Sequence, residues 1–313
     1  MPLISKSFVS LIFLFIFSYR CIATELSDAG LYVLPYPQQV TIGGDAFIVN
    51  NDLTIVLNKN HSAADAFAAN ELVKDMKDQW NISAQISNHK GEFSIVLLRK
   101  KINAKHPKQS YQITVGKNEI IITGNDEEGL FYGTRTLLQL ILKKGNVYQV
   151  PGMKITDWPA ILQRAIHYDT KHHQDKMGYV KSFIKELADY KVNMMIWEWE
   201  DKFAYPSHPE IGAPGAFTPA EIRDVTAYAK KYHIQIVPLV QGLGHVSFIL
   251  KWPQFAHLRE IPASNFEFCP LKDGSYDLLF DLWKDAMDAT PGSEYIHIGS
   301  DETYELGECE QCS

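Results

Sequence analysis

The stretch Tyr295-Ile296-His297-Ile298-Gly299-Ser300-Asp301-Glu302 closes a repeating pattern that occupies the second half of this 313-residue chain. Pro291-Gly292 precedes it, and its alternation of apolar and small residues predicts a short buried strand. Asp301 and Glu302 then fall at the carboxyl end of that strand, which is where barrel enzymes carry their catalytic groups. The acidic pair is therefore the first candidate for a site.

Strands and helices are predicted to alternate upstream of this stretch. Strand candidates at 164–168, 192–197, 234–239 and 295–298 are separated by helix candidates at 176–190, 219–232 and 275–287. This order favours an α/β class with a parallel sheet. Four strands make the first half of a TIM (β/α)8 barrel, so we expect residues 151–313 to form a partial barrel with strands 1 to 4. A complete barrel needs about 250 residues, so we expect a fragment of a longer protein; an open α/β sheet is the alternative.

A small α+β front domain is expected over residues 24–150. Strand-like runs occur at 47–49, 53–57 and 93–98, and 111–115 pairs with 120–122 as a hairpin. Apolar residues recur at helical spacing over 63–80, and Asn125 or Asp126 can cap a second helix. No catalytic constellation is evident here, which predicts a supporting role.

The first residues are typical of a targeting segment. Lys6 precedes an apolar run at 8–17 that is too short to span a bilayer comfortably, and Ala23 offers a small residue for cleavage. We interpret residues 1–23 as a signal peptide, with an uncleaved membrane anchor as the alternative. The protein is then expected in the secretory pathway, as a secreted, periplasmic or lysosomal protein.

Composition excludes one class of partner. The hydrophobic share of 46% and the charged share of 21% are ordinary for a globular protein. The formal net charge of −7 gives no reason to expect nucleic acid, whose binding needs clustered Lys and Arg.

The cysteines predict no metal. Cys21 falls in the signal peptide, Cys269 stands alone, and Cys309 and Cys312 form one C-x-x-C. One such pair supplies half of a four-thiolate zinc site, so a local loop staple or two free thiols is the preferred interpretation.

Polar residues border the predicted strands. Arg164 begins the first strand, Asp201 follows the second and His245 follows the third. Each has a plain structural alternative, because an arginine can cap the barrel floor, acids can form a solvated loop, and His245 or His297 can be a core histidine. A metal-dependent hydrolase is a further alternative, in which His245 and Asp301 join the cluster of His167, Asp169, His172 and His173.

Taken together, these positions resemble the family 20 β-N-acetylhexosaminidases. The family's fourth strand ends in His-x-Gly-Gly-Asp-Glu, which here reads from His297 to Glu302 with Ser300 at the second glycine. The segments 197–206 and 240–245 are most similar to the hexosaminidase D-like branch, and 129–140 resembles the end of the family's front domain.

The resemblance implies an exo-acting retaining β-N-acetylhexosaminidase that removes terminal N-acetylglucosamine or N-acetylgalactosamine by substrate-assisted catalysis. It implies β-linked N-acetylhexosaminide glycans as partners and needs no cofactor or metal. A truncated non-catalytic carbohydrate-binding remnant is the alternative function. The implied catalytic residues are Glu302, the general acid and base, and Asp301, which holds the acetamido group; Arg164 binds sugar hydroxyls, Asp201 and His245 orient the carboxylates, and His297 belongs to the motif.

Overall fold

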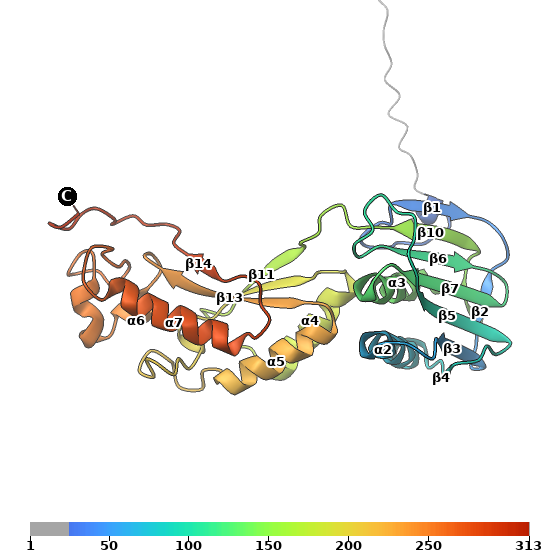
Figure 1. The fold of residues 1–313 in the computed structure, drawn as a ribbon, viewed down its shortest axis with the longest axis horizontal. Helices are drawn as coiled ribbons and strands as arrows, with labels where there is room; N and C mark the ends of the chain where they lie inside the picture. The colour runs from blue at the N-terminus through green and yellow to red at the C-terminus, as the bar shows by residue number, and fades with distance from the viewer. Residues whose placement is uncertain (1–24, 313) are drawn as a thin grey trace, which may run out of the picture.

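The computed structural model describes residues 25–312, so the expected signal peptide lies outside the described residues. Between residues 25 and 312, no helix is both long and apolar enough to cross a bilayer. Two halves follow each other along an elongated molecule, and the helices of the first half face the second (Figure 1).

The front domain is a mixed sheet covered by two helices. Its seven strands lie in the order β1-β10-β6-β7-β5-β3-β4. Helices α2 (Ala63–Trp80) and α3 (Glu127–Leu140) pack on the side of this sheet that faces the second half (Figure 1). The strands are β1 (Gln39–Ile42), β3 (Leu53–Leu57), β4 (Ala84–Ser87), β5 (Phe93–Arg99), β6 (Tyr111–Val115), β7 (Glu119–Gly124) and β10 (Met153–Asp157). A short helix, α1 (Glu25–Asp28), and a three-stranded sheet of β2 (Phe47–Val49), β9 (Val147–Val150) and β8 (Leu142–Lys144) complete the domain.

Local capping explains where the two long helices begin. Ser62 accepts a hydrogen bond from Asp65 N, and the Asp65 carboxylate accepts one from Ser62 N, which makes a capping box at the start of α2. Asn81 ends this helix in the left-handed conformation. Asp126 caps α3 through Gly129 N at 2.8 Å, as the sequence predicted.

The front domain extends past the expected boundary at residue 150. Strand β10 pairs with β1 and β6 inside the seven-stranded sheet. Its last residue, Asp157, is buried and accepts hydrogen bonds from the Tyr111 hydroxyl at 2.6 Å and from Lys191 Nζ at 3.2 Å. Residues 153–157 are therefore part of the sheet of the front domain.

The second half confirms the expected parallel α/β order. Strands β11 (Ala165–Asp169), β12 (Met194–Glu198), β13 (Gln235–Gly242) and β14 (His297–Gly299) lie side by side in chain order, and every neighbouring pair is parallel. The connecting segments carry α4 (Met177–Asp189), η1 (Glu200–Lys202), α5 (Pro219–Lys231), α6 (Ser247–Leu250), η2 (Pro253–Leu258) and α7 (Ser275–Ala289).

The last strand is not buried as expected. Tyr295 and Ile298 are 48% and 46% exposed. The reason is that β14 is an edge strand, with β13 as its sole neighbour among the residues described. Only one side of this strand therefore contributes to the sheet.

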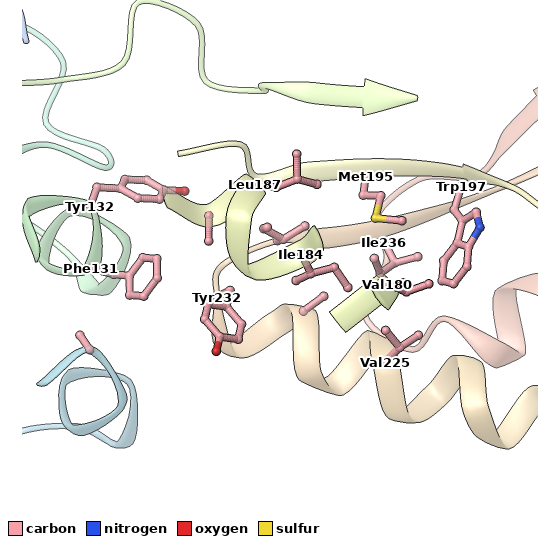
Figure 2. Close-up of a cluster of buried hydrophobic side chains, with 14 of the residues drawn as sticks. Phe131, Tyr132, Val180, Ile184, Leu187, Met195, Trp197, Val225, Tyr232 and Ile236 are labelled. Carbon is pink, nitrogen blue, oxygen red and sulfur yellow. The ribbon is translucent and has the colours of Figure 1, made fainter. Parts of the chain in front are cut away.

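An aromatic and aliphatic cluster joins the two halves. Phe131 and Tyr132 of α3 face Tyr232, which follows α5 (Figure 2). The Tyr232 ring lies 5.0 Å from Phe67 of α2 and 6.1 Å from Phe131, and both contacts are edge-on. This geometry favours aromatic pairs beyond the area they bury. Ile184 and Val225 continue the cluster into the barrel helices (Figure 2).

A buried ion cluster reinforces the same interface. Asp75 of α2 pairs with Arg135 of α3 at 2.5 Å, and with Lys185 of α4. The Arg135 side chain is 0% exposed and also approaches Asp189 at 3.3 Å. Asp75 therefore neutralises one buried cation inside the front domain and a second cation that comes from the barrel.

We expect Asp75→Asn to destabilise the fold by about 3–5 kcal/mol, since it leaves a buried guanidinium without its main counter-charge. Urea unfolding would measure this loss. The matched control is Asp78→Asn, which neutralises an exposed carboxylate on the same helix. A loss for Asp75→Asn no larger than that of the control would show that the cluster is not needed.

Candidate active site

Two loops at the carboxyl ends of β13 and β14 bring three predicted residues together. His245 Nε2 lies 2.9 Å from Glu302 Oε2 and 3.9 Å from Asp301 Oδ2. The two carboxylates are 55% and 65% exposed, so they open to solvent at this end of the sheet. The imidazole therefore contacts Glu302 directly and lies close to Asp301.

Backbone conformation lets these loops approach each other. His245, Ser300 and Glu302 all have positive φ, at 57°, 72° and 51°. A Cβ on Gly244 would lie 2.6 Å from Asp301 O, and one on Gly299 would lie 1.9 Å from Gln241 Oε1. The contact at Gly244 is with backbone and leaves no room for a Cβ, and at Gly299 the positive φ of 65° also favours glycine.

The segment 258–269, which we call the bracing hairpin, holds both loops in place. Phe268 N donates to Leu243 O at 2.8 Å, and Val246 N donates to Phe266 O at 3.1 Å, which fixes the loop of His245. Glu305 N donates to Glu267 Oε1 at 3.0 Å, which fixes the chain after Glu302. One hairpin therefore sets the distance between the imidazole and the carboxylates.

Aromatic rings of the two loops also pack together. The His245 ring lies edge-on to the Phe266 ring at 5.0 Å, and the Tyr304 ring stacks on the same Phe266 ring at 6.1 Å. The Tyr304 hydroxyl hydrogen-bonds Glu302, which raises the pKa of Tyr304. Glu302 is thus contacted from both loops.

Asp201 lies in η1 and forms its own ion cluster. It pairs with Lys202 and with Lys251 Nζ at 3.1 Å. Burial alone would raise the pKa of Asp201, but hydrogen bonds from Lys202 and Lys251 lower it. The structure shows no contact between this carboxylate and His245, Asp301 or Glu302 within residues 25–312.

Arg164 is not brought to the mouth of the sheet. Its guanidinium donates to Lys191 O at 2.6 Å, to Gln109 Oε1 at 2.9 Å and to Ile161 O at 2.9 Å. These partners lie at the amino ends of the strands, beside the front domain. The backbone of Arg164 precedes β11, which favours the alternative in which the arginine caps the floor. Its buried Nη2 has no hydrogen-bond partner among residues 25–312.

His297 is the first residue of β14. Its Nδ1 accepts a hydrogen bond from Gly299 N at 3.1 Å, within its own strand. It is exposed, so it is not the core histidine of the alternative interpretation. The edge position of β14 is the reason for this exposure.

A buried acid network was missed by the sequence analysis. Glu198 is 0% exposed and contacts His167 Nε2 and Gln241 Nε2, each at 2.9 Å. These three residues come from adjacent strands β11, β12 and β13. Glu198 is the last residue of its strand, and only the strand register shows that its side chain turns inward.

The alternative metal cluster on the first strand does not form. His167 is used by Glu198, Asp169 pairs with Lys171 at 3.2 Å, and His173 pairs with Asp175 at 3.6 Å. Within the described part of the chain, the cluster His245, Asp301 and Glu302 has ligand atoms close enough to share an ion, whereas His167, Asp169, His172 and His173 do not.

A cavity of about 1250 Å³ lies elsewhere, between the front domain and the barrel. It is lined by Gln109 and by the strand beginnings Met194 and Gln235, together with Tyr295. This position is the amino end of the sheet, opposite the carboxylates, where conserved chemistry of barrels is not found. The cavity is therefore not the candidate active site.

Glu200 provides a pH-dependent prediction. Burial, followed by the nearby Glu198 charge, raises the pKa of Glu200 from 4.5 to about 7. Between pH 4.5 and about 7, the Glu200 carboxyl is protonated in the folded state and ionised in the unfolded state. The free energy of unfolding therefore falls as pH rises through this window. We expect Glu200→Gln to stabilise the protein by roughly 2 kcal/mol at pH values above the window and little below it.

Urea unfolding of Glu200→Gln and wild type on both sides of the window would measure the effect. Glu186→Gln, which changes an exposed carboxylate on α4, is the matched control and should follow wild type at both pH values. A gain for Glu200→Gln that does not depend on pH would contradict the assignment to charge burial.

Comparison with known proteins agrees with the two halves of the fold. The sequence family described as "Glycosyl hydrolase family 20, domain 2" matches residues 30–158, and "Glycosyl hydrolase family 20, catalytic domain" matches residues 163–313. The chain is 24% identical to the chitobiase of Flavobacterium johnsoniae, with a TM-score of 0.76 over 88% of this chain and 45% of that one. For the N-acetyl-β-hexosaminidase of Streptomyces plicatus the TM-score is 0.75, with 24% identity over 87% and 59%. These two likenesses show the fold.

Curated relatives carry similar descriptions. Hexosaminidase D of Bos taurus is 33% identical over 148 residues, which cover 47% of this chain and 43% of the relative. The β-hexosaminidase of Porphyromonas gingivalis is 26% identical over 312 residues, covering 88% of this chain and 39% of the relative. The chain thus spans about two fifths of the length of these relatives. Since the two family matches together account for most of the chain, it belongs to glycosyl hydrolase family 20.

Proposed function

We propose that this protein is an exo-acting retaining β-N-acetylhexosaminidase. The observation that carries the proposal is the contact of His245 Nε2 with Glu302 Oε2 at 2.9 Å, beside Asp301, in a chain of family 20. Terminal N-acetylglucosamine or N-acetylgalactosamine of β-linked glycans is the proposed substrate. The family's enzyme relatives do not favour a non-catalytic sugar-binding remnant.

The proximity of the acids suits two roles on one sugar. Carboxylate oxygens of Asp301 and Glu302 lie within 4.8 Å of each other and of His245 Nε2. In substrate-assisted enzymes the acetamido group of the sugar takes the place of a carboxylate nucleophile, and the proposed retention follows from that replacement.

In the proposed reaction, Glu302 protonates the leaving glycosidic oxygen as the carbonyl oxygen of the sugar's acetamido group attacks the anomeric carbon. Asp301 accepts the acetamido N–H and stabilises the positive charge that develops on the resulting ring. Glu302 then removes a proton from a water molecule, which opens that ring and restores the sugar with its original configuration. Neither carboxylate forms a covalent bond to the sugar, as is the case for substrate-assisted family 20 enzymes.

His245 is proposed as a positioning residue. Its Nε2 lies 2.9 Å from the Glu302 carboxylate, on the side of the β13 loop, so it limits the rotamers that Glu302 can adopt. Preorganised groups avoid the cost of reorienting during the reaction. The bracing hairpin keeps the imidazole at this distance through Leu243 and Val246.

We expect Glu302→Gln to lower kcat/KM on an aryl N-acetyl-β-glucosaminide by roughly 10²–10⁴, the usual contribution of general acid and base catalysis. Asp301→Asn should harm this substrate far more than an aryl β-glucoside without the acetamido group. Glu308→Gln, an exposed carboxylate in the same segment, is the control and should keep full activity. Wild-type turnover by Glu302→Gln would refute the assignment, and equal losses of Asp301→Asn on both sugars would refute substrate assistance.

Export is part of the proposal and rests on the sequence of residues 1–23. Amino-terminal sequencing of the mature protein should find the chain beginning near residue 24. A mature chain that keeps Met1 would contradict cleavage and favour the membrane-anchor alternative.

A further inference from the structure

Four side chains beyond the carboxylate pair converge on one point next to the bracing hairpin. Glu260 and Cys269 lie on the hairpin and are both 0% exposed. Cys309 and Cys312 come from the segment after β14 and are half-buried. One ligand atom of each residue lies within 4.8 Å of all the others. We call these four residues the thiol cluster.

Distances in the thiol cluster suit a shared cation. Cys269 Sγ lies 3.4 Å from Cys309 Sγ and 3.6 Å from Cys312 Sγ, and Cys312 Sγ lies 3.8 Å from Glu260 Oε2. Sulfurs that bind one tetrahedral zinc at about 2.3 Å are separated by roughly 3.8 Å. The three sulfurs and the carboxylate oxygen are therefore spaced like the corners of one coordination tetrahedron.

Turns of the backbone follow two of the cysteines. Cys312 N donates to Cys309 O at 3.0 Å, and Lys272 N donates to Cys269 O at 3.4 Å. Cys269 and Cys309 therefore each stand at the start of a hydrogen-bonded turn.

Glu260 gives the cluster a negative charge. Its Oε1 accepts from Gly307 N at 3.0 Å and from Cys309 N at 2.9 Å. No lysine, arginine or histidine forms an ion pair with this carboxylate in residues 25–312. A buried anion facing three thiols calls for a cation.

We propose that Cys269, Cys309, Cys312 and Glu260 bind one structural zinc ion. Thiolates are soft ligands that favour zinc over magnesium or calcium, and four protein ligands leave no open position for catalysis. Binding replaces the three thiol protons, which leave to solvent, by three Zn–S bonds, and the carboxylate supplies the fourth ligand. A disulfide would use only two of the sulfurs and leave the third thiol beside the anion of Glu260.

This zinc would cross-link the bracing hairpin to the chain that carries Asp301 and Glu302. The hairpin already fixes the loop of His245, so the ion closes a ring of contacts around the carboxylate pair. Its role is positioning, and its presence does not rest on the proposed glycosidase activity. Metal content and activity therefore test the two proposals separately.

The test is elemental analysis of the purified protein, in the longest form in which it is expressed and without added chelator. We expect one zinc per chain. Cys309→Ser and Glu260→Gln should weaken zinc binding by more than about 100-fold, because even residues that only support a ligand contribute about 10–100-fold. Glu260→Gln keeps the shape of the side chain, and Glu308→Gln is the matched control that should keep its zinc.

Two further measurements keep the proposal falsifiable when a variant fails to fold. Cobalt added to metal-free wild type should give the sulfur-to-cobalt charge-transfer absorption of three thiolates, and zinc should remove this absorption. Alkylation under denaturing conditions with chelator should modify Cys269, Cys309 and Cys312. A disulfide among these three residues in metal-free protein, another metal at unit stoichiometry, or equal zinc content in Glu308→Gln and Cys309→Ser would overturn the proposal.

Discussion

The candidate site depends on the parallel pairing of β13 with β14. Leu239 lies opposite His297 and Gly242 lies opposite Gly299, so the register shifts by one residue at the end of the sheet. This shift lets the loop of His245 meet the loop of Asp301 and Glu302 instead of passing beside it. Glycines at the contact positions favour this approach: a Cβ at position 244 would lie 2.6 Å from Asp301 O, and one at position 242 would lie 3.3 Å from Ile298 O.

Support for this pairing comes from two directions. On the inner side, Glu198 accepts from Gln241 of β13 and contacts His167 of β11, which ties three strands together in a buried polar network. On the outer side, the bracing hairpin binds both loops through backbone hydrogen bonds and the Glu267 carboxylate. The front domain contributes at the opposite end, where α2 and α3 pack on the barrel helices and Asp75 neutralises cations from both halves. Asp301 and Glu302 are therefore exposed to solvent, while the sheet and the bracing hairpin beneath them are held by many contacts.

Much of the fold could be predicted because its signals are local. The helix at 63–80 has the predicted ends, because the residues at its ends, the capping box of Ser62 with Asp65 and the left-handed Asn81, are adjacent to it in sequence. Strand β10 fell outside the expected front domain because only its pairing with the distant strands β1 and β6 makes 153–157 part of the sheet. The same contrast holds at the site. His245, Asp301 and Glu302 were found from strand ends, whereas the inward turn of Glu198 and the floor position of Arg164 depend on register. Glu260 and Cys269 could not be linked to the C-x-x-C, because only the hairpin brings them there.

The left-handed backbone at Ser300 restricts how this corner can change over evolutionary time. Each non-glycine residue held in that region costs of order 1–3 kcal/mol, which the surrounding contacts must offset. Glycine, and to a lesser extent asparagine, can replace Ser300 without this cost, whereas valine, isoleucine or threonine would add crowding at Cβ. Substitutions at position 300 are therefore restricted by the backbone conformation alone, independently of any bound sugar. Exchange between serine and glycine is tolerated, and most other residues are disfavoured.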